Sequence, residues 1–478
     1  MNLAQQTMLT ELSSILDPAG IVTDPAAIDP WTTDWRQRWH GHTPALLAPR
    51  STAEVVTIVR AASSHRVPLV PQGGNSSMVG GATPAADGSA LILSLRRMNR
   101  IRTQGETMAV AEAGVILQTL HEAALATGRR FPLTLGARGS ATIGGLVSTN
   151  AGGTQVLRFG TMRGLVLGVE AVLADGLVHD GLAALAKDNR GYSLDQLMIG
   201  AEGTLGIVTA AALKLVPAVT ARAVAWAGVA DPTAALALLR RFQRTSDAIE
   251  SFEIMPAETL DAALAHVPDA RAPLAGRHPW HLLIEATAAA PDAEPPASLV
   301  ERVLARALDD GLVGDATIAA SEAQAEAFWR LRDSLSDAER ATGPAAQHDI
   351  AVPVDTMPRF MIEAAAACEA RFPGTRASGF GHLGDGNIHF HVRAPKGADR
   401  DRWYAEDAPA ISAFVHDLVT RAGGTISAEH GIGQMKREEL ARLAPPGRMA
   451  ALAAIKAALD PLGILNPGKL LAPVTPAQ

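Results

Sequence analysis

The sequence predicts a mixed α/β or α+β protein of two or three domains. Its 478 residues exceed the length at which a single hydrophobic core usually stops growing. Short β-type runs alternate with helical periodicity in residues 42–219, and long Ala/Leu/Arg helices alternate with strand-like pieces in residues 220–440. A composition of 47% hydrophobic and 19% charged residues is typical of a globular protein with a large core.

The elements of the first half follow from local signals. Residues 1–41 are expected to form a lead helix and a loop, whose Trp31, Trp35 and Trp39 pack against the body of the protein. Ser51 and Glu54 have the spacing of a capping box, and the apolar positions after them indicate a helix. Strands are expected at 67–71, 91–93, 108–110 and 169–173.

The second half of the chain has longer helical patterns and more proline-rich joints. Helices are expected at 232–244, 296–310 and 321–342, separated by proline-rich joints, with a strand at 280–285. This pattern indicates a second α+β domain. The tail over 446–472 is expected to be a helix followed by a turn-rich segment.

Charge, cysteine content and the N-terminus exclude several classes of protein. A net charge of -7 gives no general basic face for nucleic acid. Cys368 is the single cysteine, so no intramolecular disulfide can form, and we expect it to be a buried, inert thiol. We find no signal peptide and no apolar run of about 18 residues that could span a membrane. We therefore expect a cytoplasmic protein.

Three glycine-rich segments, 71–81, 135–160 and 199–209, are the first functional signal. Glycine lets backbone approach a ligand closely, and successive N–H groups in such a loop can bind an anion such as a pyrophosphate. The alternative is a set of glycine-rich turns without a ligand. The Walker pattern is absent, and the GxGxxG at Gly379, Gly381 and Gly384 precedes a strand instead of a helix, so we reject it as a dinucleotide motif.

Histidines and one glutamate form the second signal. In the alternating run 387–392, Asn387, His389 and His391 share one strand face, while the apolar residues share the other. His382 precedes a Gly-Asp-Gly turn that can bring it beside His389. Glu429 and His430 follow about forty residues later. Imidazoles and a carboxylate suit zinc, manganese or iron, although each histidine alone could be a surface or hydrogen-bonded residue.

Segments 71–81, 132–165 and 199–209 resemble the FAD-binding domain of the vanillyl-alcohol-oxidase type. The resemblance extends over roughly residues 40–472, and it looks closest to the group of D-2-hydroxyglutarate dehydrogenases, D-lactate dehydrogenases and glycolate oxidase flavoprotein subunits. It implies an α+β fold with a two-part FAD-binding domain at 42–219. A substrate or cap domain with an antiparallel sheet would occupy 220–440, and a segment at 441–478 would return to the FAD domain.

The resemblance also implies non-covalent FAD and a set of cofactor contacts. These are Pro71, Gln72, Gly73, Gly74, Asn75, Ser76, Ser77, Gly136, Gly139, Ser140, Gly144, Gly145, Thr149, Asn150, Gly152, Glu202, Gly206, Ile207 and Asn466.

The motifs GHLGDGNIH and SAEHG resemble the two metal motifs of the same group. They imply His382, His389 and Glu429 as ligands of a divalent metal, with zinc the first choice, and His430 as the general base at the substrate hydroxyl. The chemistry is consistent, because a divalent cation lowers the pKa of a bound hydroxyl and the flavin then takes the hydride.

The substrate carboxylate needs a cation. By resemblance, Arg332 and Ser336, four residues apart on a helix, contact this carboxylate, and Gln347 and His391 also line the substrate. The resembling 2-hydroxyglutarate enzymes carry Lys at the Gln347 position and Asn at the His391 position. Gln347 is neutral, which leaves open lactate-like, malate-like and bulkier apolar D-2-hydroxy acids beside 2-hydroxyglutarate.

The sequence thus predicts an FAD-dependent dehydrogenase of D-2-hydroxy acids. Its electron acceptor would be a separate partner, such as an electron-transfer flavoprotein or a quinone-linked carrier, and a homodimer is open. The alternatives are an oxygen-using oxidase, a flavin-binding subunit of a glycolate-oxidase-like complex, and a zinc hydrolase whose glycine loops are scaffold.

Overall fold

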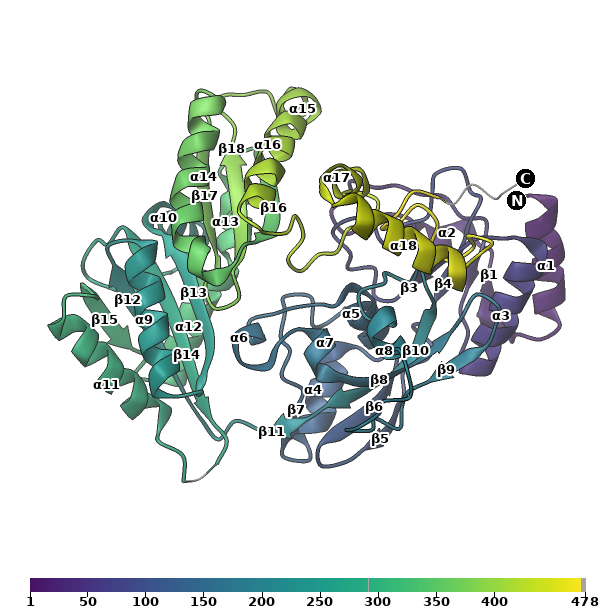
Figure 1. Ribbon diagram of the computed structural model, residues 1–478, viewed down its shortest axis with the longest axis horizontal. Coiled ribbons are helices and arrows are strands. Elements are labelled where there is room, and N and C mark those ends of the chain that lie inside the picture. The colour runs from purple at the N-terminus through teal and green to yellow at the C-terminus, as the bar shows by residue number, and fades with distance from the viewer. Residues whose placement is uncertain (291, 474–478) are drawn as a thin grey trace. The chain divides into compact units, whose positions relative to one another are not determined.

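The computed structural model describes residues 1–290 and 292–473, and the chain divides into two compact units (Figure 1). The first unit comprises residues 1–153, 160–217 and those from 429 onward. The second comprises residues 154–159 and 218–428. Residues 429–440, which were expected in the substrate domain, belong to the first unit. No helix in the described ranges combines the length and apolar character needed to cross a membrane.

The first unit has two main sheets, as expected of a two-part domain. One sheet has the order β1-β2-β4-β3, in which β2 and β3 run parallel to β4. The other is antiparallel with the order β5-β6-β10-β8-β9, and a small ribbon pairs β7 with β11. The strands are β1 Ile21–Val22, β2 Leu46–Leu47, β3 Leu69–Gln72, β4 Leu91–Ser94, β5 Ile101–Gln104, β6 Met108–Glu112, β7 Arg129–Arg130, β8 Val166–Val172, β9 Val178–Asp180, β10 Ile207–Lys214 and β11 Val216–Pro217.

Helices α1 and α3 cover the first of these sheets. Met8 and Leu12 of α1 and Ile58 of α3 are fully buried in the same core cluster as Leu69 of β3. The helices of this unit are α1 Leu3–Ser13, α2 Pro25–Ile28, α3 Thr52–His65, α4 Leu117–Leu125, α5 Ile143–Thr149, α7 Met162–Leu165, α8 Leu194–Met198, α17 Arg437–Leu443 and α18 Pro446–Leu459. The expected packing of Trp35 is wrong, because its side chain is 55% exposed.

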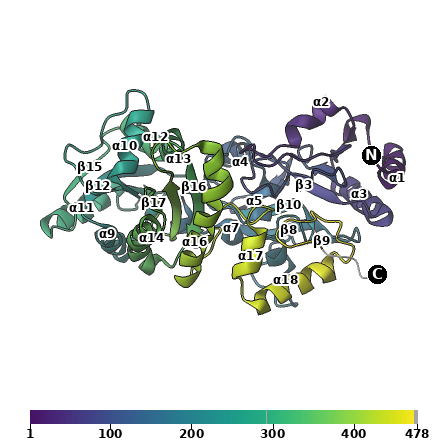
Figure 2. The same ribbon diagram turned by 90° about the horizontal axis from the view of Figure 1, so that it is seen from above.

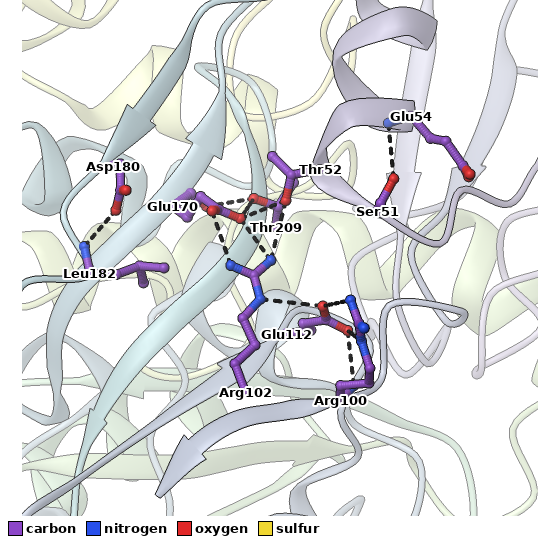
Figure 3. A network of polar contacts seen from close by, with 10 residues as sticks. All are labelled: Ser51, Thr52, Glu54, Arg100, Arg102, Glu112, Glu170, Asp180, Leu182 and Thr209. Carbon is purple, nitrogen blue, oxygen red and sulfur yellow. Dashed lines mark hydrogen bonds and ion pairs between the residues drawn. The ribbon is translucent and has the colours of Figure 1, made fainter. Parts of the chain in front are cut away.

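The predicted capping box of α3 is only half formed. The Ser51 hydroxyl accepts the N–H of Glu54 at 3.2 Å (Figure 3). The Glu54 carboxylate, however, accepts the N–H of Arg50 at 2.8 Å instead of that of Ser51. The helix therefore begins where the pattern predicts, with one reciprocal bond moved by one residue.

An ion network joins α3 to the antiparallel sheet (Figure 3). Arg102 of β5 donates two hydrogen bonds to the carboxylate of Glu170 on β8, both at 3.0 Å, and a third to Glu112 on β6 at 3.3 Å. The hydroxyls of Thr52 and Thr209 each donate to Glu170 at 2.7 Å. Burial opposes ionisation, but the arginines beside them outweigh it and hold the pKa of Glu112 and of Glu170 below the usual value.

Replacing Arg102 with leucine is therefore expected to lower the free energy of unfolding at neutral pH. The change leaves the buried carboxylate of Glu170 without its cationic partner, and the loss should be about 2–3 kcal/mol, less than for a fully buried pair because Arg102 is partly exposed. Because the folded pKa values are lowered, this stability is present above the unfolded pKa near 4.5 and disappears as pH falls through the folded values. Urea unfolding at several pH values should show the R102L penalty shrinking in acid; a penalty independent of pH contradicts this account.

The second unit is one antiparallel sheet with the order β15-β12-β14-β13-β17-β18-β16. Its strands are β12 Ala221–Val229, β13 Ile249–Pro256, β14 Trp280–Ala288, β15 Asp315–Ile318, β16 Ala345–Ala351, β17 Arg376–His382 and β18 Asn387–Arg393. Its helices are α6 Val156–Phe159, α9 Pro232–Thr245, α10 Ala257–His266, α11 Pro296–Asp309, α12 Glu322–Asp333, α13 Leu335–Ala341, α14 Met357–Arg371, α15 Arg400–Arg402 and α16 Ala408–Arg421.

Helices cover both faces of this sheet (Figure 2). One core cluster combines sheet residues with α9, α11, α14 and α16, and another combines the opposite face with α10, α12 and α13. The strand predicted at 280–285 and the helices predicted at 232–244 and 296–310 are confirmed. The single helix expected over 321–342 is wrong, because α12 ends at Asp333 and α13 begins at Leu335.

Cys368 lies in α14 and is fully buried. Burial raises the pKa of its thiol to about 12, so almost no reactive thiolate forms near neutral pH. The expected inert thiol is confirmed.

Candidate active site

A layer of polar side chains lies on the α12/α13 side of the second unit's sheet. The alternation predicted for 387–392 is confirmed: Ile388, Phe390 and Val392 are buried in the cluster with α14 and α16. The opposite side chains therefore face α12 and α13. We define the polar layer as Glu253, Gln347, Asp349, His382, His389 and His391 of the sheet, with Arg332 and Glu339 of the covering helices.

The three predicted metal ligands form a group that could hold a metal ion. His382 ends β17 and His389 lies in β18, across the tight turn that the Gly-Asp-Gly sequence predicted. Glu429 directly follows Ala428, the last residue of the second unit. One ligand atom from each of His382, His389 and Glu429 lies within 4.8 Å of the others. Two imidazoles and one carboxylate leave coordination positions open, as catalytic zinc sites do.

The rejected GxGxxG is also explained by this geometry. Gly379 and Gly381 lie inside β17, and β18 follows without an intervening helix. A Cβ at Gly381 would lie 2.4 Å from the carbonyl oxygen of Asn387, so this glycine is required by the close approach of the two strands.

Glu253, which the sequence analysis missed, is the buried partner of this group. It lies directly opposite His382 in the β13–β17 register, and it is 1% exposed. Its Oε1 lies 2.8 Å from His382 Nδ1, and its Oε2 accepts from Arg332 Nε at 2.7 Å. Burial alone would raise the pKa of Glu253, but the charges of Arg332 and His382 outweigh it and lower this pKa. An acidic residue inside the otherwise apolar run of β13 is the signal that could have revealed it.

The guanidinium group of Arg332 therefore already forms an ion pair with Glu253 in this structure. Besides Glu253, its Nη2 lies 3.1 Å from His382 Nε2 and 3.3 Å from Nδ1. Ser336 is half-buried on α13, and the break at Ser334 separates it from the helix that carries Arg332. Ser334 keeps near-helical angles, φ -78° and ψ -10°, so the two side chains stay roughly one turn apart.

A second buried carboxylate, Glu339, lies at the far end of the polar layer. It forms an ion pair with Arg393 and lies 3.7 Å from His391 Nδ1, which is beyond hydrogen-bond range. Burial would raise the pKa of Glu339, but His391 and Arg393 outweigh it and hold this pKa below its usual value. Gln347 lies directly opposite His391 in the β16–β18 register and is half-buried.

The glycine loops of the first unit have two kinds of glycine. At some positions protein atoms leave no room for a side chain: a Cβ at Gly74 would lie 1.8 Å from the carbonyl oxygen of Ser140, and one at Gly144 would lie 2.6 Å from Ala113 Cβ. Packing alone therefore accounts for glycine at these two positions. At Gly136 and Gly139, by contrast, a Cβ would meet open space, and neither residue has a positive φ.

Several polar side chains predicted as cofactor contacts hold the loops together. Gln72 donates to the carbonyl oxygens of Trp31 and Ala82, both at 2.9 Å, and Asn75 donates to that of Thr33 at 2.8 Å. Asn466 donates to the carbonyl oxygen of Glu202 at 2.7 Å. The other predicted contacts that use their side chains locally are Ser77, Ser140, Thr149 and Asn150.

Glu202 anchors the loop that follows His430. Its two carboxylate oxygens accept the N–H groups of Ile432 and Gly433, each at 2.7 Å. Burial raises the pKa of Glu202, while the two N–H groups and the nearby Lys436 and Lys469 oppose that rise. Glu202, which we predicted to contact the cofactor, thus holds the loop that follows His430, the candidate general base.

Comparison with protein families places the chain. Residues 43–181 match the FAD binding domain, and residues 219–470 match the C-terminal domain of FAD linked oxidases. The chain belongs to the FAD-linked oxidases. It is therefore an FAD-dependent oxidoreductase, and the vanillyl-alcohol-oxidase-type α+β fold predicted from the sequence is confirmed.

Relatives of this FAD-linked oxidase cover nearly the whole chain. It is 36% identical to the mitochondrial D-2-hydroxyglutarate dehydrogenase of Arabidopsis thaliana, over 96% of this chain and 80% of the relative. The mitochondrial enzyme of the same name from Bos taurus is 36% identical over 95% and 81%. The D-2-hydroxyglutarate dehydrogenase of Stutzerimonas stutzeri is 33% identical over 97% and 99%.

Two solved structures share the fold. p-Cresol methylhydroxylase with substrate bound has a TM-score of 0.75 at 16% identity, over 99% of this chain and 98% of that one. Alkyldihydroxyacetonephosphate synthase has a TM-score of 0.69 at 16% identity, over 97% and 84%. At this identity the likeness concerns the fold alone.

The residues present fit FAD. The exposed Gly136 and Gly139 border open space that side chains would fill, and packing gives no reason for glycine at either position. Thr142, at the start of α5, has a buried hydroxyl oxygen without a hydrogen-bond partner among the described residues. A bound nucleotide running along this segment accounts for both observations.

Replacing Gly139 with valine is expected to weaken FAD binding without unfolding the protein. The side chain would enter the space left for the cofactor, and a steric cost of about 1–3 kcal/mol corresponds to roughly a 10–100-fold loss of affinity. Flavin content after dilution and dialysis measures the effect. Gly447→Val in α18 is the matched control, because a Cβ there also meets open space. Equal flavin retention by the two variants would contradict the assignment.

Proposed function

We propose that this chain oxidises a D-2-hydroxy acid to the 2-oxo acid as an FAD-dependent dehydrogenase assisted by a divalent metal. The observation that carries this proposal is the grouping of His382, His389 and Glu429 within 4.8 Å in a member of the FAD-linked oxidases. Relatives named D-2-hydroxyglutarate dehydrogenase, at about the same length as this chain, support the substrate class.

The chain's own residues would perform the remaining tasks. When bound, FAD supplies the hydride acceptor, and a divalent cation held by His382, His389 and Glu429 supplies a positive charge that favours the ionised form of the hydroxyl. His430 would take the proton of the substrate hydroxyl as general base. Arg332 would bind the substrate carboxylate through the planar fork of its guanidinium group.

Electrons would then leave the reduced flavin to a separate acceptor. The sequence carries no motif for a second redox cofactor. An electron-transfer flavoprotein or a quinone-linked carrier would serve in a dehydrogenase, while oxygen would serve in an oxidase.

The D-2-hydroxy acids differ in the group at the distal end, away from the hydroxyl and the first carboxylate. The relatives' names favour 2-hydroxyglutarate, whose second carboxylate needs a cation. Arg332 is assigned to the carboxylate next to the hydroxyl, Arg393 pairs with the buried Glu339, and Gln347 is neutral. These contacts favour a D-2-hydroxy acid with an uncharged distal end, as in lactate.

Replacing Gln347 with lysine is expected to raise kcat/KM for D-2-hydroxyglutarate relative to D-lactate about 10-fold. A charge-assisted hydrogen bond to the distal carboxylate contributes about 1.5–3 kcal/mol, part of which burial of the ammonium group offsets. Steady-state rates on both acids with an artificial acceptor measure the ratio. Gln347→Met controls for loss of the amide, and a ratio that moves equally in both variants argues against a distal carboxylate site here.

Anaerobic titration of the purified protein tests the function as a whole. The visible flavin bands should bleach with one or more D-2-hydroxy acids and stay unchanged with the L-enantiomers. A panel of lactate, malate and 2-hydroxyglutarate identifies the substrate. A yellow protein that none of the D-acids bleaches would refute the proposed function.

A further inference from the structure

Glu253 is a buried carboxylate that binds two side chains of the candidate active site, His382 and Arg332. It is 1% exposed, and its two carboxylate oxygens bind different partners. Oε1 contacts His382 Nδ1 at 2.8 Å, while Oε2 contacts Arg332 Nε at 2.7 Å and Nη2 at 2.6 Å. Both partners come from other elements, β17 and α12, so the carboxylate connects three elements at one point.

A charge in this position needs an explanation beyond stability. On the same side of the sheet, beyond the polar layer, Met255 and Phe328 are apolar and buried. Buried ion pairs are often no more stabilising than apolar residues of the same volume. An apolar residue at 253 could fill the space, but it could neither bind His382 Nδ1 nor align the guanidinium group of Arg332.

The contact with Nδ1 selects one form of the imidazole. A carboxylate beside Nδ1 favours the tautomer that carries its proton there, which leaves the lone pair on Nε2. Arg332 Nη2 lies 3.1 Å from Nε2 in this structure, and a bound metal would take that place. Such a carboxylate–histidine pair also fixes the ring orientation and makes the ligand more basic.

We propose that Glu253 is a positioning residue that couples the metal ligand His382 to the carboxylate anchor Arg332. This inference rests on the proposed function and deepens it. Glu253 sets the tautomer and orientation of the imidazole with one oxygen and the direction of the guanidinium group with the other. Loss of its charge therefore disturbs metal binding and substrate binding together.

The polar layer offers a matched control in Glu339. It is equally buried at 1% and also lies beside an arginine and a histidine, Arg393 and His391. Neither of these belongs to the group of potential metal ligands. Glu339→Gln therefore removes a similar buried charge without touching His382.

The experiment compares zinc affinity of the full-length flavoprotein in the wild type, Glu253→Gln and Glu339→Gln. Competition with a chromophoric chelator measures affinity without turnover, and anaerobic flavin bleaching measures the half-saturating concentration of the active D-2-hydroxy acid. Glu253→Gln is expected to weaken zinc binding about 10–100-fold and to raise the half-saturating concentration. Glu339→Gln should leave zinc affinity within about 2-fold, because second-sphere effects act through a ligand's own hydrogen bond.

Further variants and outcomes separate the possible failures. If Glu253→Gln does not fold, Glu253→Gln/Arg332→Met removes the orphaned guanidinium charge as well, and it should still bind zinc weakly. Wild-type zinc affinity in either variant overturns the positioning role while leaving the proposed function standing. A wild-type protein that binds neither zinc, manganese nor iron overturns the metal site itself, and this inference with it.

Discussion

Replacing His430 with asparagine is expected to leave the protein yellow and folded while its reduction by the D-2-hydroxy acid falls about 10²–10⁴-fold, the usual contribution of a general base. Asparagine keeps hydrogen-bonding groups at the position but cannot accept a proton near neutral pH. Stopped-flow measurement of flavin bleaching under anaerobic conditions gives the rate directly, without dependence on the electron acceptor.

The backbone around His430 is expected to keep its conformation in this variant. Glu202 holds the N–H groups of Ile432 and Gly433, so the backbone after His430 has an anchor that the substitution does not touch. His266→Asn at the end of α10 serves as a control histidine and should bleach at the wild-type rate. Bleaching of the His430 variant at that same rate would assign the proton transfer to another group.

Much of the fold could be predicted because its signals are local. Period-two alternation placed Ile388, Phe390 and Val392 in the core and the histidines on the other face, as the structure shows. The break between α12 and α13 could not be predicted, because Ser334 keeps near-helical angles and the run around it reads as one helix. Likewise, the partner of Glu54 depends on how the preceding loop enters the helix.

In the candidate site, too, contacts between residues close in sequence could be predicted, and contacts between distant residues could not. The grouping of His382 with His389 follows from a short turn between adjacent strands, which sequence spacing can indicate. Glu253 joins them only through the β13–β17 pairing, across more than a hundred residues of chain, so no spacing rule could find it. Gly74 and Gly136 both lie in glycine-rich segments, and the sequence does not distinguish their roles. The structure does: packing requires glycine at 74, whereas Gly136 borders open space.

Removal of divalent metal is expected to slow flavin reduction about 10²–10³-fold while leaving the flavin bound. Without a cation, the negative charge that develops on the substrate oxygen loses several kcal/mol of stabilisation. Residues 71–81, 135–153 and 199–209, which would hold FAD, lie in the first unit, whereas His382 and His389 lie in the second. Dialysis against a chelator, followed by anaerobic stopped-flow bleaching, measures the loss, and adding back zinc or manganese should restore the rate.

The variant His389→Asn distinguishes a catalytic metal from a merely structural one. It removes a ligand from β18 while keeping a polar side chain on that face, so the flavin spectrum and the thermal unfolding temperature should stay close to wild type. Added zinc should not restore its rate, unlike that of the chelated wild type. Full activity of the chelated wild type would contradict the metal's role. A variant that zinc restores would show instead that His389 is not a ligand, which leaves His382 and Glu429 to bind the cation with another partner.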